Sequence, residues 1–234
     1  MKIISSAYYD QGIRRINEDS ILYEEMVING KTALLAMVAD GVGGLEDGHV
    51  ASGYAVESMM KLFVMDIKSR ILEGTGFRKI KKCILYETRQ IYDALKRYAD
   101  IKGIKLGTTF SLLFIYKKRY LVIHLGDSSI KSLRGARCKN LTPLHQNPDG
   151  SLNRCLGSIT FQSPYIRSGM VFKNTGYLLS TDGFTNLMGN DIESLKPKEI
   201  HNEDQIEKRL LAIGNRVSKR GETDNKSAIY IKVG

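Results

Sequence analysis

The stretch TALLAMVADGVGG, residues 32–44, decides how this chain folds. An unbroken apolar run that ends in turn residues is typical of a buried strand, and here the run ends at Asp40. A second strand candidate, SILYEEMV at 20–27, precedes it. The residues between them include Asn29-Gly30, a favoured two-residue hairpin turn. The sequence therefore predicts an antiparallel hairpin whose second strand ends in an aspartate.

Apolar spacing predicts the remaining elements. In chain order they are helices over about 48–66 and 77–99, strands at 108–116, 120–127 and 129–135, a loop-like region at 140–170, a strand at 176–182, a helix over 204–219 and a strand at 227–233. The three central strands are spaced closely enough for an antiparallel meander. Two strand groups separated by a helix pair predict two sheets covered by helices, because each one-sided element must bury its apolar face.

Length and composition indicate an ordinary globular protein. With 234 residues, of which 42% are hydrophobic and 26% charged, we expect a single domain that spans residues 1–234. No stretch approaches the roughly 18 apolar residues of a membrane span, so no membrane association is expected. Three widely spaced cysteines fit reduced thiols better than a disulfide framework. These features favour the cytoplasm.

The formal net charge of +10 permits attraction to nucleic acid, membranes or phosphorylated proteins, and by itself it does not choose among them. The densest basic stretch, residues 78–82, lies in a segment with apolar residues at helical spacing, which is typical of a solvated helix face. No nucleic-acid recognition motif accompanies the charge. Nucleic acid is therefore the weakest of the candidate partners.

Acidic residues recur at strand ends. Three apolar strands end in an aspartate, in LLAMVADGVGG at 34–44, YLVIHLGDSS at 120–129 and GYLLSTDGF at 176–184, and a fourth aspartate opens the last strand in TDNKSAIYI at 223–231. Any one Asp-Gly pair would ordinarily be a turn. Carboxylates gathered at the mouths of buried strands repel one another unless a cation neutralises them. The repetition therefore favours a cation site over four separate turns.

The available ligands favour a hard metal ion. Oxygen-only ligation suits Mg²⁺ or Mn²⁺, whereas zinc usually requires closely spaced histidines or cysteines. The four histidines are isolated in the sequence, and no zinc-protease, serine-hydrolase or P-loop motif is present. Several common enzyme classes are thereby excluded.

Seven collinear stretches resemble the metal-dependent serine/threonine protein phosphatases of type 2C, in their compact bacterial form, over nearly the whole chain. They are RRINEDS at 14–20, VADGVGGLEDGHVAS at 38–52, LGTTFSLL at 106–113, HLGDSSI at 124–130, NRCLGS at 153–158, LLSTDGF at 178–184 and TDNKSAIYI at 223–231. The resemblance implies an α+β fold, a four-layer α-β-β-α sandwich with two antiparallel sheets flanked by helices. It also implies a binuclear Mn²⁺ or Mg²⁺ centre at one end of the sandwich.

The same resemblance implies roles for individual residues. The metal set would be Asp40 bridging both ions, Asp182, Asp224, the Gly41 carbonyl, and Glu18 and Asp19 through water. Two such ions would activate a bridging water for in-line attack on phosphorus, without a covalent enzyme intermediate. Arg14, rather than the adjacent Arg15, matches the phosphate clamp. Asp127 matches a position that, with Asp182, holds a third ion in bacterial relatives.

Some residues differ from the family pattern, and one residue could have either of two roles. Val42 stands where eukaryotic relatives carry a proposed proton-donating histidine, which leaves a metal-bound water, His49 or His145 as candidates. Leu45 and Ser129 also differ from the usual residues, and the segment from 143 to 172 is short for the flap that contacts protein substrates. Asn225 either orients the neighbouring aspartate or is a simple turn residue.

The leading hypothesis is hydrolysis of phosphoserine and phosphothreonine on proteins that a cognate serine/threonine kinase phosphorylates, by a monomer. The alternative is a non-catalytic metal-binding sensor or interaction module of the same fold, in which the changes at Val42 and Leu45 mark lost chemistry.

Overall fold

The predicted hairpin forms and fixes the alignment of two acidic residues. In the computed structural model, which describes residues 1–157 and 160–234, β2 (Asp19–Ile28) and β3 (Lys31–Asp40) pair antiparallel. Asn29 and Gly30 both have positive φ, 51° and 70°, as a tight two-residue turn requires. Because such a turn fixes the register of the whole hairpin, Asp19 lies directly opposite Asp40 at its open end.

Two five-stranded antiparallel sheets form the centre of the molecule. The β3 sheet has the order β2-β3-β4-β5-β8, with β4 (Phe110–Tyr116), β5 (Arg119–Leu125) and β8 (Tyr165–Met170). The β10 sheet has the order β1-β10-β9-β6-β7, with β1 (Ile3–Asp10), β10 (Lys226–Val233), β9 (Thr175–Ser180), β6 (Ser129–Arg134) and β7 (Arg137–Asn140). Each sheet therefore combines strands from both halves of the chain.

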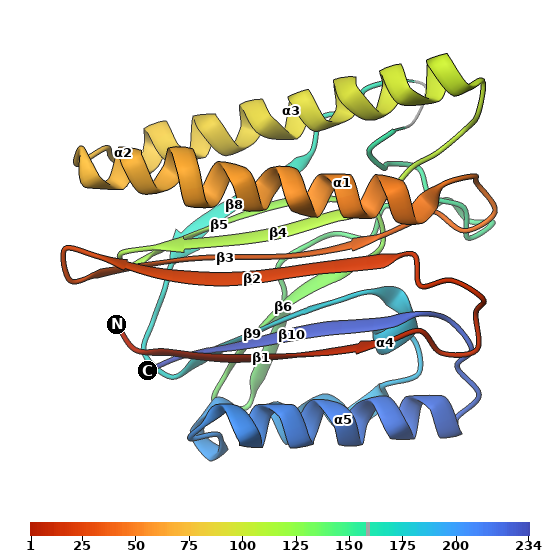
Figure 1. Cartoon of the computed structure of the whole chain (residues 1–234). Helices are drawn as coiled ribbons and strands as arrows, with labels where there is room; N and C mark the ends of the chain where they lie inside the picture. The colour runs from red at the N-terminus through yellow and green to blue at the C-terminus, as the bar shows by residue number, and fades with distance from the viewer. Residues whose placement is uncertain (158–159) are drawn as a thin grey trace.

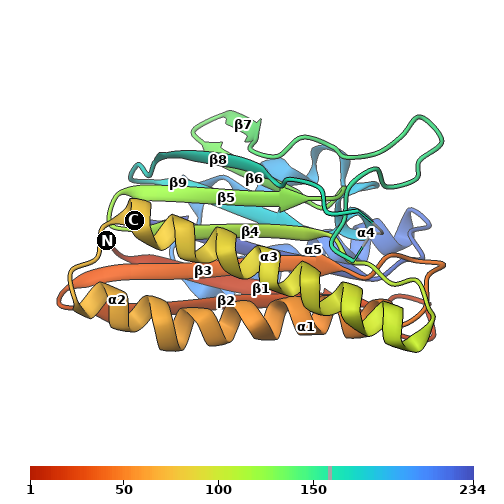
Figure 2. The ribbon, with the colours of Figure 1, turned by 90° about the horizontal axis from the view of Figure 1, so that it is seen from above.

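Helices cover the outer face of each sheet, which confirms the four-layer α-β-β-α sandwich (Figure 1). Over the β3 sheet run α3 (Phe77–Lys102) and a second rod, made of α1 (Gly48–Lys61), a π-helical segment η1 (Leu62–Ile67) and α2 (Lys68–Leu72); Figure 2 shows both from above. The β10 sheet is covered by α5 (Glu203–Lys219), with the short α4 (Asp182–Thr185), η2 (Gly189–Leu195) and η3 (Pro197–Glu199) before it. Within residues 1–157 and 160–234, no helix combines the length and apolarity needed to cross a bilayer.

Three apolar layers hold the sandwich together. One lies between the sheets and includes Val38, Leu179 and Ile229, and the other two lie between each sheet and its helices. Strands β3 and β4 are buried on both faces, which explains why their sequences are continuous apolar runs rather than alternating ones. The predicted helices also exist: the first two run further than the apolar spacing indicated, to Leu72 and Lys102, and α5 begins one residue earlier than predicted.

The predicted central meander is wrong at its third strand. Strand β5 pairs with β4, but β6 joins the other sheet, between β9 and β7. The connection contains Gly126, whose φ of +112° is open mainly to glycine, and it carries the chain from one sheet to the other. Short sequence spacing therefore produced a crossover between sheets instead of a third neighbouring strand.

The region expected to be loop-like contains β8, and β7 lies just ahead of it. Strand β8 is an edge strand with alternating partly buried and exposed residues, and every residue of β7 is exposed. Edge strands bury too little surface to need an apolar run, so their sequence signal is weak. The last residue of the NRCLGS stretch, Ser158, lies outside the described residues.

Candidate active site

The strand-end aspartates Asp40, Asp182 and Asp224 lie around one cavity. The end of β3, helix α4 and the start of β10 lie at the end of the sandwich away from both chain termini (Figure 1). Asp40 ends β3, Asp182 begins α4 just after β9, and Asp224 lies just before β10. The cavity has a volume of about 270 Å³ and is lined by Asp40, Val42, Gly43, Thr109, Asp127, Gly150, Ser151, Leu152, Asp182 and Asp224. The structure thus brings together carboxylates from both sheets.

Close backbone approaches shape the cavity walls. A Cβ atom on Gly41 would lie 2.6 Å from the carbonyl carbon of Gly48 and 2.9 Å from the Cβ of Glu18. On Gly183 it would lie 2.1 Å from the carbonyl oxygen of Asn225. Both contacts are shorter than carbon side chains tolerate, so glycine is required where the chain turns past the ends of the strands.

Asp19 is the most deeply buried acidic residue of the site. Only 2% of its surface is exposed, and its Oδ2 accepts a hydrogen bond of 3.0 Å from the Thr181 hydroxyl. Its Oδ1 has no hydrogen-bond partner within the described part of the chain. Burial raises the pKa of Asp19 to about 7, and the nearby charges of Asp182 and Asp224 contribute to the rise. An unpaired, buried carboxylate oxygen of this kind fits a site for a cation.

The carboxyl groups that line the cavity repel one another. Burial raises the pKa of Asp40 well above its usual range, and the charges of Asp19 and Asp182 raise it further. Burial also raises the pKa values of Asp127 and Asp182, and Asp224 adds to both effects. So many carboxyls in one place are stable together only if they bind protons or a cation. The oxygen-only donor set fits a hard divalent cation such as Mn²⁺ or Mg²⁺.

These carboxylates do not yet form a closed ligand cluster. Among residues 1–157 and 160–234, no three aspartate, glutamate, histidine or cysteine side chains converge in metal-binding geometry. Several of the acids have protein partners instead. Asp182 Oδ1 accepts a hydrogen bond of 2.7 Å from the Gly183 amide, and Asp127 Oδ2 accepts one of 2.8 Å from Gln146 Nε2. A cation that binds to these carboxylates would have to replace some of these hydrogen bonds.

Arg14 and Glu18 reach the site on the loop between β1 and β2. The Arg14 guanidinium forms an ion pair with Asp224, with 2.7 Å between Nη2 and Oδ2. Burial raises the pKa of Glu18, while the charges of His49 and Arg14 oppose the rise, which places these groups near one another. Arg15 is exposed. The structure therefore brings Arg14, rather than Arg15, to the aspartates.

The two histidines proposed as proton donors have different surroundings. His145 is 6% exposed, its Nδ1 accepts a hydrogen bond of 3.2 Å from the Gly126 amide, and its ring stacks on that of His124 with 4.8 Å between centroids. Burial lowers its pKa. His49 is exposed near the start of α1, close enough to Glu18 to influence its pKa. His145 thus has a packing role, and of the two His49 alone is open to solvent.

Sequence reasoning missed several residues that support the site. The Thr109 hydroxyl accepts a hydrogen bond of 2.9 Å from the Asp40 amide, and Thr109 also lines the cavity. Thr181 and Gln146 donate to Asp19 and Asp127, as described above. For Thr109 a signal existed, since LGTTFSLL belongs to the family pattern, but Gln146 lies in a segment whose sequence has no periodicity.

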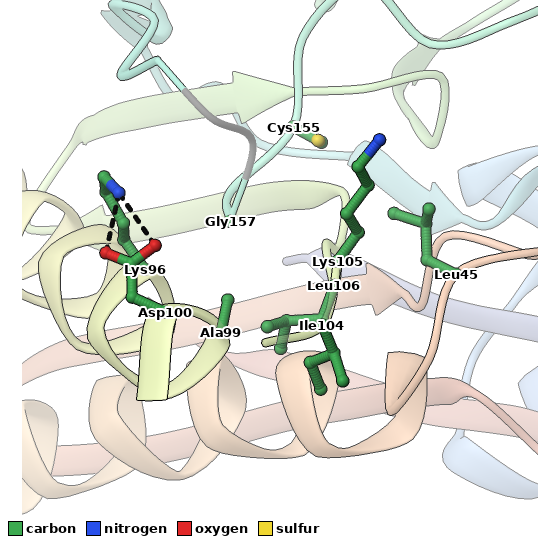
Figure 3. A pocket seen from close by; sticks show the side chains of 9 residues that line it. All are labelled: Leu45, Lys96, Ala99, Asp100, Ile104, Lys105, Leu106, Cys155 and Gly157. Carbon is green, nitrogen blue, oxygen red and sulfur yellow. Dashed lines mark hydrogen bonds and ion pairs between the residues drawn. The ribbon is translucent and has the colours of Figure 1, made fainter. Parts of the chain in front are cut away.

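A second cavity, of about 300 Å³, lies beside α3 (Figure 3). Leu45 reaches it from the same loop that contributes Val42 and Gly43 to the first cavity. Its ionic groups include Lys96 and Asp100, which pair with each other at 2.7 Å. Lys105 also lines this cavity, but none of the predicted metal-binding or phosphate-binding residues does, so the acidic cavity is the stronger candidate for the active site.

Comparison with known proteins identifies the family of the chain. The model of the protein phosphatase 2C family matches residues 13–223. A putative protein phosphatase 2C-type from Streptococcus pyogenes is 24% identical, over 78% of this chain and 79% of its own length. Protein phosphatase PhpP from Streptococcus pneumoniae is 26% identical, over 85% and 86%.

Solved structures share the fold. PppA, described as a regulatory component of the T6SS in Pseudomonas aeruginosa, has a TM-score of 0.80 at 20% identity, over 100% of this chain and 99% of its own. The catalytic domain of the serine/threonine phosphatase PstP, in complex with two manganese ions, has a TM-score of 0.79 at 20% identity, over 99% of both chains. Because the family model matches most of the sequence, the chain belongs to the protein phosphatase 2C family.

Proposed function

We propose that this phosphatase hydrolyses phosphoserine and phosphothreonine on proteins with the help of two divalent cations, Mn²⁺ or Mg²⁺, held at the acidic cavity. The observation that carries the proposal is that Asp40, Asp182 and Asp224 line one cavity. The buried Asp19, whose Oδ1 has no hydrogen-bond partner among the described residues, lies directly opposite Asp40 in the hairpin. Support also comes from PstP, which shares the fold and whose catalytic domain was solved with two manganese ions.

The protein ligands of the two ions would be Asp40, Asp182, Asp224 and the Gly41 carbonyl, with Glu18 and Asp19 as outer groups. When bound, such ions supply charge neutralisation and activation of the attacking water at neutral pH. The chain's own contribution is to place the acids on two different sheets at one end of the sandwich. Asp127, which Gln146 holds at 2.8 Å, would complete a third and weaker site with Asp182.

Arg14 would bind the phosphoryl group of the substrate. A guanidinium can donate two parallel hydrogen bonds to phosphate oxygens, and the Arg14 side chain is 51% exposed, so a substrate can reach it. Its present partner, Asp224, is one of the proposed ion ligands. The ion pair therefore holds the Arg14 guanidinium beside the proposed ion site, where the phosphoryl group would bind.

The substrates would be phosphorylated proteins produced by a serine/threonine kinase, and we propose that the enzyme acts on them in the cytoplasm as a monomer. The net charge of +10 favours encounters with anionic phosphoproteins. The segment Gly150–Leu152 lines the cavity together with Val42 and Gly43 of the glycine-rich loop that follows β3, so it would contact the residues that flank the phosphorylated side chain.

The proposal is tested by measuring Mn²⁺-dependent hydrolysis of a phosphothreonine peptide, together with Mn²⁺ binding by titration calorimetry. Asp182→Asn should lower kcat/KM by about a hundredfold or more, because it removes an ion ligand. The matched control is Asp204→Asn, on the exposed first turn of α5, which should behave like the wild type.

Two outcomes would reject the proposal. Hydrolysis that survives both EDTA and Asp182→Asn would show that the cavity acids do not hold the catalytic ions. Stoichiometric binding of two Mn²⁺ ions by a wild-type protein that hydrolyses neither the peptide nor an aryl phosphate would favour the non-catalytic sensor instead.

A further inference from the structure

One asparagine side chain closes the loop that carries Arg14. The amide nitrogen Nδ2 of Asn225 donates to the carbonyl of Gln11 at 2.7 Å and to the carbonyl of Ile16 at 3.2 Å. Its Oδ1 accepts a hydrogen bond of 2.9 Å from the Glu18 amide. Asn225 is only 6% exposed. A single side chain thus binds both ends of the segment 11–18, which the sequence alone did not indicate.

Further contacts shape the same loop around the start of β10. Gly12 has a φ of +64°, and a Cβ there would lie 2.4 Å from the carbonyl oxygen of Asp224, so the loop backbone lies directly against the aspartate. The Ile13 amide donates to the carbonyl of Thr223 at 3.3 Å. Inside the loop, Gln11 Nε2 donates to the Arg14 carbonyl at 2.7 Å. The backbone of Arg14 is therefore held on two sides.

Apolar packing does little to hold this loop in place. Its two isoleucines, Ile13 and Ile16, are 77% and 55% exposed, so burial of apolar surface contributes little to its order. The loop's conformation depends instead on hydrogen bonds, and three of them involve Asn225. A loop that lost these bonds would sample many positions of the Arg14 guanidinium, although Arg14 itself would still be present.

We propose that Asn225 is a positioning residue for Arg14: it fixes the loop 11–18 so that the guanidinium meets the phosphoryl group beside Asp224. This inference rests on the proposed role of Arg14 in phosphate binding. It assigns to Asn225 a function that differs from both roles considered in the sequence analysis. The Asn225 side chain bonds to Gln11, Ile16 and Glu18 instead of to the Asp224 carboxylate, which accepts from the Asn225 backbone amide, and it therefore does more than turn the chain. Aspartate could not replace it, since it lacks the Nδ2 donor.

The test is a double-mutant cycle between Asn225→Ala and Arg14→Ala, read as KM for a phosphothreonine peptide and as the inhibition constant of inorganic phosphate. In the wild-type background, Asn225→Ala should raise both constants about tenfold, the effect of about one lost charged hydrogen bond. In the Arg14→Ala background it should change them less than about twofold, because the residue acts through Arg14. Asn225→Asp should behave like Asn225→Ala.

Two comparisons separate positioning from a general loss of stability. Asn202→Ala removes the N-terminal capping bond of α5, in which Asn202 Oδ1 accepts from the Gln205 amide at 3.0 Å, and should lower thermal stability without raising KM. Gln11→Ala changes an exposed side chain of the loop and should raise KM by a smaller factor than Asn225→Ala, which keeps the inference testable if Asn225→Ala does not fold.

Hydrogen–deuterium exchange supplies a measurement that does not depend on activity. Amides in residues 11–18 should exchange faster in Asn225→Ala than in the wild type, and not in Asn202→Ala. Unchanged exchange, or equal effects of Asn225→Ala on KM with and without Arg14, would overturn the inference. An inactive wild type whose loop is nevertheless ordered by Asn225 would instead contradict the proposed function, so the two failures can be told apart.

Discussion

The two parts of the active site are held in different ways. The arginine loop, residues 11–18, is fixed by hydrogen bonds with Asn225 and with Thr223, in the segment that precedes β10. The acid cluster, which comprises Asp19, Asp40, Asp127 and Asp182, is held by the ends of strands while its members repel one another. Protein hydrogen bonds alone therefore hold the arginine loop in place, whereas the acid cluster is stable only when it binds protons or cations.

The largest expected effect concerns the buried carboxyl of the acid cluster. Without metal at pH 8, Asp19→Asn should raise the free energy of unfolding, by about 4 kcal/mol at most, since burial raises the pKa of Asp19 from 3.8 to about 7 and each unit corresponds to about 1.4 kcal/mol. Between those two pH values the folded wild type keeps a proton that the unfolded chain releases, so its stability falls as pH rises. Below the lower value the advantage of the variant should vanish.

Urea unfolding at several pH values, with EDTA present, measures this difference. A variant that is less stable than the wild type at pH 8 would contradict the account of the acid cluster as a source of electrostatic strain.

Cation binding should affect the two parts unequally. At a free Mn²⁺ concentration of about one hundred times the dissociation constant, each bound ion should stabilise the protein by about 2.7 kcal/mol. Differential scanning fluorimetry should show this as a higher Tm that EDTA reverses and that is smaller in Asp182→Asn. Exchange of amides near Asp40 and Asp182 should slow, while the arginine loop should change little. Protection confined to the arginine loop would refute the contrast.

An ion pair between the buried Lys226 and the partly exposed Asp10 anchors the beginning of the arginine loop. Lys226 is 1% exposed and pairs with Asp10 at 2.9 Å between Nζ and Oδ2, and Asp10 also accepts from the Gly12 amide. Asp10→Asn should lower the free energy of unfolding by about 2 kcal/mol, because it leaves a buried ammonium group without its counter-charge. Asp100→Asn, which breaks an exposed pair with Lys96, is the control and should cost less than about 1 kcal/mol. Chemical denaturation of both variants provides the comparison.

The smallest effect on stability is expected at Arg14. Its pair with Asp224 is exposed, with side-chain exposures of 51% and 38%, so Arg14→Ala should change the free energy of unfolding by less than about 1 kcal/mol. The same variant should raise KM for a phosphopeptide by about tenfold or more, since charge-assisted hydrogen bonds to phosphate are lost. Denaturation and steady-state kinetics on one preparation measure both. A large loss of stability with an unchanged KM would mean that Arg14 is structural.

Much of the fold could be predicted from sequence because its central strands carry local signals. The Asn29-Gly30 turn fixes the register that sets Asp19 opposite Asp40, and the buried runs at β3 and β4 need no tertiary information. The family model also spans most of the chain. The crossover of β6 and the edge strand β8 were missed, because pairing partners depend on contacts far along the chain rather than on local pattern.

Within the site, the acids were predictable and their supports were not. Asp40, Asp182 and Asp224 each follow or precede an apolar strand, so their placement follows from the strands themselves. The contacts of Asn225 and Gln146 join segments far apart in sequence, Asn225 with Gln11 and Gln146 with Asp127. Such contacts leave no periodic trace in a single sequence.

The apolar layer between the sheets also acts as a spacer for the active site. Asp40 is attached to the β3 sheet, and Asp182 and Asp224 to the β10 sheet, so the separation of these acids is set by how the side chains of Val38, Leu179 and Ile229 fill the gap. Packed sheets lie about 10 Å apart, and the spacing depends on the volume between them. A substitution deep in this layer can therefore lower activity without touching the active site, because it changes the distance between the acids of the two sheets.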